Sequence, residues 1–253
     1  MMHQDAPFAL QRALTALESR HIELPQPVQA AADLWRTITA SRPAEPPTSA
    51  LRDAVIAQAD ETELGAALLL DLGAGRLSSA WAQAGTETAS RALQAILTHR
   101  QEIHTQLAPL ADELIAKLQA TAALGDTPIN TLIREGLHDE ARLLAEVDSF
   151  AADLDSLYTF SAQYLTPNGF RSLNVGHINC SRWRNGPDID HALRGGITEG
   201  LLSGLRATPA GELWFPTAEE AIAVAQRYWD EYAVVETQRK NELFGQGSTV
   251  AWA

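Results

Sequence analysis

The sequence contains a single cysteine, Cys180, and only two lysines among its 253 residues. One cysteine cannot form a disulfide within the chain, and it cannot build a zinc site that needs several thiolates. No hydrophobic run approaches the roughly 20 apolar residues that span a bilayer. The first residues also lack the charged and apolar regions of a secretory signal. We therefore expect a cytoplasmic protein without a transmembrane helix, a metal or another cofactor.

Basic residues are scarce as well. The chain has 19 lysines and arginines against 32 aspartates and glutamates, which gives a formal net charge of −13. Such a charge repels phosphate groups, so nucleic acids and anionic membranes are not expected partners. The 45% of hydrophobic residues is enough for a core, and the 43 alanines favour helices. A GC-rich genome would account for the abundance of alanine and for the preference of arginine over lysine.

Apolar residues at spacings of three and four predict two long helices, over about 86–124 and 137–165. Pro109 lies inside the first and is expected to kink or divide it. Gly125 can end one helix, and Pro128 suits the start of the next. Two long helices joined by such a turn should pack as an antiparallel hairpin. The hairpin can be the core of a helical bundle or a protruding coiled-coil arm used in assembly.

The composition changes after Leu165. Residues 165–211 hold eight of the 16 glycines and five arginines against three acidic residues, whereas the rest of the chain carries a net charge of −15. Partial alternation of apolar residues predicts strands over 170–178 and 212–215. Thr217 and Glu220 form a capping box, which predicts that a helix begins there.

These patterns predict a mainly α fold with two domains. Residues 1–165 would form an N-terminal helical bundle that contains the long antiparallel hairpin. Residues 166–253 would form a small, glycine-rich α+β domain. The boundary is placed at the turn signal Thr166-Pro167-Asn168-Gly169.

Cys180 has two chemical interpretations and a structural one. His177 lies close enough in sequence to act as a base for a thiol nucleophile. A metal could instead be held by His177 and Cys180 together with His191 and either Asp188 or Asp190. Neither arrangement matches a specific motif. We therefore expect a buried, unreactive thiol and no catalytic residue.

The segment Arg182-Trp183-Arg184 places two guanidinium groups around an indole in a glycine-rich setting. Arginine and tryptophan are enriched where proteins bind partners or anions. A surface turn whose arginines pair with the chain's own carboxylates is the simpler alternative. The candidate binding residues, for a protein partner or an anionic ligand, are Arg171, His177, Arg182, Trp183, Arg184 and His191.

The chain lacks the phosphate-binding, dinucleotide-binding, zinc-protease and serine-hydrolase motifs. We therefore expect a non-enzymatic assembly or scaffolding protein that binds a protein partner or a second copy of itself. An alanine- and arginine-rich helical body would suit a structural protein of a bacterial mobile element. The alternative is an enzyme or binding protein for a phosphorylated or carboxylated small molecule, in which the basic residues between 171 and 194 converge in one pocket.

Overall fold

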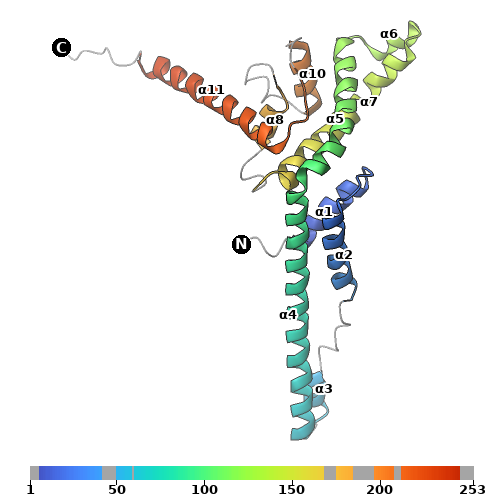
Figure 1. Ribbon diagram of the computed structural model, residues 1–253, viewed down its shortest axis with the longest axis vertical. Helices are drawn as coiled ribbons and strands as arrows, with labels where there is room; N and C mark the ends of the chain where they lie inside the picture. Colours follow the sequence, from blue (N-terminus) through green and yellow to red (C-terminus); the bar gives the residue numbers. More distant parts are fainter. Residues whose placement is uncertain are drawn as a thin grey trace, which may run out of the picture. The chain divides into compact units, whose positions relative to one another are not determined.

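The computed structural model describes residues 6–41, 50–58, 60–167, 175–184, 197–207 and 212–245. Within these ranges the protein is mainly α, with ten α-helices, one short π-helix and no strand. None of the described helices is both long and apolar enough to cross a membrane. The chain divides into two compact units, Met1–His99 and Arg100–Ala253 (Figure 1).

The first unit is built on one long helix. Helices α1, α2 and α3 all pack against α4 (Figure 1). Helix α4 begins after Asp60, whose carboxylate accepts a hydrogen bond of 2.9 Å from the backbone N–H of Glu63. The four helices are α1 (Ala6–Glu18), α2 (Gln26–Ala40), α3 (Ala50–Ile56) and α4 (Glu61–Thr98).

Burial differs sharply between the two ends of α4. Near its C-terminal end, Ala89, Ala92 and Ile96 are fully buried. In the first half of the helix, Ala67 is the one buried residue. The core of this unit therefore lies where α1 and α2 cover α4, and the N-terminal half of α4 contacts little besides α3 among the described residues.

The second unit contains the predicted hairpin. Helices α5 (Arg100–Ala123) and α7 (His138–Phe160) run antiparallel, with the short helix α6 (Ile129–Arg134) in the connection (Figure 1). Gly125 follows α5 with a φ of +63°, a conformation that suits glycine, as the predicted helix stop requires. The fully buried contacts of the pair include Ile103, Leu107, Leu118, Ala151 and Leu154.

The first arm of the hairpin is shorter than the predicted span of 86–124. The helical path is interrupted at His99, between α4 and α5, and not at Pro109. Pro109 lies inside α5, where its side chain is exposed to solvent. A proline ring on the solvent side of a helix avoids the packed face, and this position allows α5 to continue through it.

The predicted α+β character of the C-terminal part is wrong for the described residues. The chain after α7 forms helices and one isolated antiparallel bridge between Trp183 and Leu213. Part of the segment predicted as a strand over 170–178 is helical, because Val175 begins α8, which packs on α11. The elements are the π-helix η1 (Ser161–Leu165), α8 (Val175–Ser181), α10 (Ile197–Ala207) and α11 (Ala218–Gly245).

The capping box that begins α11 is confirmed. The N–H of Thr217 donates to the Glu220 carboxylate at 2.9 Å, and the N–H of Glu220 donates to the Thr217 hydroxyl at 3.3 Å. Helices α8 and α10 pack on other elements of the same unit, α8 on α11 and α10 on α5 and α7. The predicted boundary between two domains after Leu165 stays a prediction.

We predict that Leu107→Ala lowers the free energy of unfolding by about 2–5 kcal/mol, because the Leu107 side chain of α5 is fully buried. Leu144→Ala on α7 should cost less, since Leu144 is only half-buried. Urea denaturation followed by circular dichroism measures both. A loss below about 0.5 kcal/mol for Leu107→Ala would contradict the packing of the hairpin.

Candidate functional site

The turn Arg182-Trp183-Arg184 is held on both sides by backbone hydrogen bonds. The N–H of Arg184 donates to the carbonyl of Glu212 at 2.9 Å, and the N–H of Trp214 donates to the carbonyl of Arg182 at 3.1 Å. The Tyr158 hydroxyl of α7 donates to the Trp214 carbonyl at 2.7 Å. These bonds attach the turn and the extended segment before α11 to the hairpin.

Arg182 is an interior residue. It is 5% exposed, donates to the carboxylate of Asp155 on α7, and lies over the ring of Tyr158 at 5.0 Å. Trp183 is 2% exposed. This burial does not fit the expectation that Arg182 and Trp183 contact a partner. Neither side chain can reach a partner unless the turn rearranges.

Arg184 is the member of the turn that faces solvent, and its side chain is half exposed. It pairs with Glu212 at 2.7 Å and stacks over the ring of Trp214 at 4.2 Å. Arg182 therefore pairs with Asp155, and Arg184 pairs with Glu212. This arrangement agrees with the simpler alternative, in which the arginines of the turn pair with the chain's own carboxylates. A binding role stays a prediction and rests on Arg184 within this turn.

The other candidate residues are not brought together by the described structure. Arg171 and His191 lie outside the described residues, as do Asp188 and Asp190. His177 belongs to α8. Among the residues that the structure describes, no group of three histidine, cysteine, aspartate or glutamate side chains is placed to hold a metal ion.

Cys180 is fully buried at the end of α8. Burial raises the pKa of its thiol to about 11. The thiolate is the reactive form of cysteine, and it is scarce at neutral pH when the pKa is this high. The environment of Cys180 is therefore that of a packing residue.

We predict that Cys180 does not react with a thiol-specific reagent such as dithionitrobenzoate in the native protein at pH 7. The same residue should react completely in denaturant, where its pKa returns to about 8.5. The absorbance of the released thiolate measures both rates. Rapid native-state labelling would contradict the buried environment, and the unfolded protein serves as the control for reagent and thiol content.

We also predict different costs for removing the two carboxylates that face the turn. Asp155→Ala leaves the buried Arg182 guanidinium without its partner and should lower the free energy of unfolding by about 2–4 kcal/mol. Glu212→Ala, the matched control, removes the partner of the exposed Arg184 and should cost at most about 1 kcal/mol. Urea denaturation at pH 7 measures both values, and equal costs would contradict the assignment of Arg182 to the interior.

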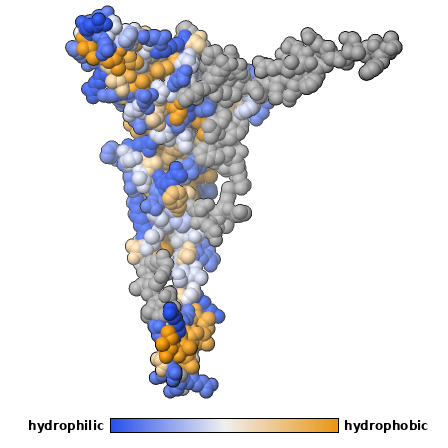
Figure 2. All heavy atoms as spheres, turned by 180° about the vertical axis from the view of Figure 1, so that it is seen from behind, coloured by the Kyte–Doolittle hydropathy of each residue, from blue (hydrophilic) through white to orange (hydrophobic). Residues whose placement is uncertain are grey.

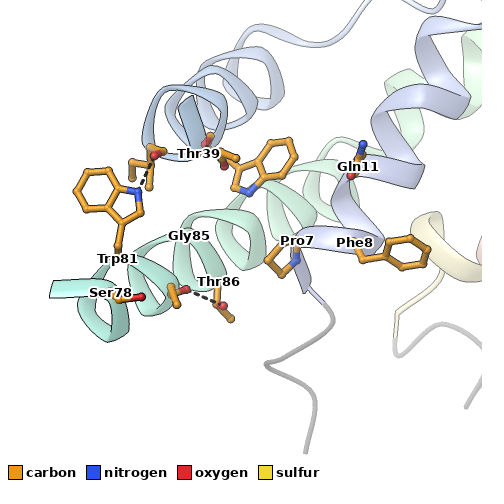
Figure 3. A pocket seen from close by; sticks show the side chains of 11 residues that line it. Pro7, Phe8, Gln11, Thr39, Ser78, Trp81, Gly85 and Thr86 are labelled. Atoms are coloured by element: carbon orange, nitrogen blue, oxygen red, sulfur yellow. Dashed lines mark hydrogen bonds between the residues drawn. The ribbon is translucent and has the colours of Figure 1, made fainter. Parts of the chain in front are cut away.

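A groove of about 440 Å³ lies among α1, α2 and α4 in the first unit (Figure 3). The Trp81 indole N–H donates to the carbonyl of Ile38 at 2.9 Å and so fixes one wall. A Cβ atom added at Gly85 would meet nothing within 4 Å, so the groove is open above this residue. Its lining is apolar or uncharged, and comprises Pro7, Phe8, Gln11, Trp35, Ile38, Thr39, Ser78, Trp81, Ala82, Gly85 and Thr86. The groove therefore offers no cation to an anionic ligand.

A second apolar region lies on the surface of the N-terminal half of α4. Figure 2 shows hydrophobic atoms gathered over this part of α4 and the adjoining α3. Monomeric proteins seldom leave this many large apolar side chains exposed together. We call this region the α4 apolar surface, and it comprises Val55 and Ile56 of α3 with Leu68, Leu69, Leu70, Leu72 and Leu77 of α4, which are 44–72% exposed.

Charge is almost absent from this part of the helix. Residues 64–81 include one acidic and one basic residue, Asp71 and Arg76. Asp71 accepts a hydrogen bond of 3.2 Å from the backbone N–H of Leu51 in α3. No ion pair or hydrogen bond of the Arg76 side chain is formed within the described part of the chain. The α4 apolar surface thus includes one cation, Arg76, for which the described residues provide no carboxylate partner.

The sequence did not reveal this surface. The run Ala66-Ala67-Leu68-Leu69-Leu70 is typical of a buried helix, and only the positions of the neighbouring helices show that most of it is exposed. Comparison of the chain with protein-family models, curated proteins and solved structures gives no match.

Proposed function

We propose that this chain is a non-enzymatic assembly or scaffolding protein that binds another protein chain through the α4 apolar surface. The supporting observation is the exposure of five leucines within ten residues of one helix. Burial of a leucine side chain is worth roughly 1.5–3 kcal/mol relative to its exposure. A partner that covers several of these leucines would therefore bind with a substantial hydrophobic contribution.

The backbone of the same segment also favours a partner. Gly65, Gly73 and Gly75 lie in the helix, where each is about 1 kcal/mol less favourable than alanine. Helices in proteins owe most of their stability to packing of an apolar face. Added Cβ atoms at these glycines would meet nothing within 4 Å, so they leave open space along the helix. A second helix could approach closely there and supply the missing contacts.

The charges around the surface favour a protein over a membrane or a nucleic acid. Asp60, Glu61 and Glu63 stand at the start of α4, beside the exposed leucines. Carboxylates at this end would repel anionic lipid headgroups and phosphates. A protein partner with an apolar face and some positive charge matches these features.

The alternative function, recognition of an anionic small molecule, has less support among the described residues. Arg182 and Arg184 are each engaged by a carboxylate of the chain. The groove among α1, α2 and α4 carries no basic side chain. This alternative stays a prediction that depends on Arg171 and His191, outside the described residues.

We predict that the double variant Leu69→Glu/Leu72→Glu loses the binding partner while keeping its fold. Both side chains are more than half exposed, so the melting temperature should fall by only a few degrees. Two differently tagged copies expressed in the native host allow capture of either a second copy or another protein. Mass spectrometry should find at least one protein bound to the wild type and absent from the variant.

The matched control is Ile133→Glu, which changes a similarly exposed residue, 49% accessible, on α6. This variant should retain whatever the wild type binds. If the wild type and the double variant capture the same proteins in the same amounts, the proposed function is wrong.

A further inference from the structure

We infer that the α4 apolar surface is occupied by a second copy of this chain, with the two α4 helices antiparallel. This inference rests on the proposed function and names its partner. It is carried by the spacing of the exposed residues and by the distribution of charge along the first half of α4.

The exposed face of α4 has the spacing of a coiled coil. One line of residues alternates steps of three and four, which is the spacing of the contact positions in paired helices. Every member of the line is exposed in the described structure. We call this line the α4 seam, and it comprises Thr62, Gly65, Leu69, Leu72, Arg76 and Ser79.

The two leucines of the α4 seam lie at its centre, and the small residues Thr62 and Ser79 lie at its ends. In an antiparallel pair centred between Leu69 and Leu72, each Leu69 faces Leu72 of the second copy. Arg76 then lies opposite Gly65 of the second copy. Gly65 has open space where a Cβ would be, which leaves room for the aliphatic part of an arginine side chain.

Charge selects the antiparallel orientation. The acidic residues Asp60, Glu61 and Glu63 lie at one end of the segment and Arg76 at the other. An antiparallel pair places each Arg76 near the acidic first turn of the second copy, where opposite charges attract. A parallel pair would place Arg76 beside Arg76 and acid beside acid, and it would be disfavoured.

Charge within this segment does not oppose self-association. Two copies each carry a net charge of −13 and repel one another. Residues 64–81 are neutral overall, since Asp71 and Arg76 cancel. Contact through this segment therefore brings the two copies together at a surface without a net negative charge.

The oligomeric state and its dependence on the α4 seam test the inference. In sedimentation velocity over a range of concentrations, the wild-type chain should form a dimer. Leu69→Glu/Leu72→Glu should be a monomer, and Ile133→Glu should remain dimeric. A wild type that stays monomeric at every soluble concentration would overturn the inference, whereas another protein captured through the same leucines would leave the proposed function standing.

The charge contribution is measured with Arg76→Glu. Two exposed ion pairs turn into repulsions in this variant, so the dissociation constant of the dimer should rise about three- to tenfold at low ionic strength. High salt should reduce this difference because it screens exposed charges. Arg91→Glu is the matched control on the same helix, outside the α4 seam, and should leave the constant unchanged. Equal effects of the two substitutions would contradict the predicted charge pairing.

The orientation is measured with a spin label on Ser79→Cys in a Cys180→Ala background. In an antiparallel pair Ser79 lies opposite Thr62 of the second copy, 17 residues from its own equivalent along the helix. At 1.5 Å per residue the two labels are separated by about 25 Å along the axis. Double electron–electron resonance should show a distance of this size or slightly longer. A much shorter distance, as expected when the two labels lie side by side in a parallel pair, would contradict the antiparallel arrangement.

Discussion

The requirement that an apolar helix face be covered organises both units of this chain. Alanine-rich helices with few aromatic residues bury little surface each, so their stability depends on packing against one another. In the second unit α5 and α7 satisfy this requirement mutually, and their buried residues include Leu107 and Leu154. The turn around Trp183 and the segment leading into α11 are then fixed to α7 through Tyr158 and Asp155.

Helix α4 satisfies the same requirement over only part of its length. Its C-terminal half is covered by other helices of its unit, while Leu69 and Leu72 in the first half remain exposed. The contrast lies within one continuous helix, so it cannot be ascribed to a change of secondary structure. The exposure of these leucines in the described part of the chain is the observation on which the proposed assembly function rests.

Local signals were predictable from the sequence where a few neighbouring residues decide the conformation. Gly125 ends α5 with a positive φ, and Thr217 and Glu220 cap α11. The strand predicted over 170–178 is a helix from Val175 onward, because partial alternation over a few residues cannot compete with packing of α8 on α11. The burial of Arg182 was not predictable, since its partner Asp155 is distant in sequence and belongs to α7.

The arginines of the turn Arg182-Trp183-Arg184 illustrate the same limitation, because a local contrast of charge does not say which carboxylates an arginine will meet. A positively charged segment in an acidic protein can form ion pairs with an external partner or with the chain's own carboxylates, and the sequence cannot distinguish the two. In the structure Asp155 and Glu212 engage the two arginines of the turn. Arg76 lies in an apolar run beside exposed leucines, and its side chain forms no ion pair or hydrogen bond within the described residues. A partner is therefore better sought where apolar exposure and an unpaired charge coincide than where charge of one sign is merely abundant.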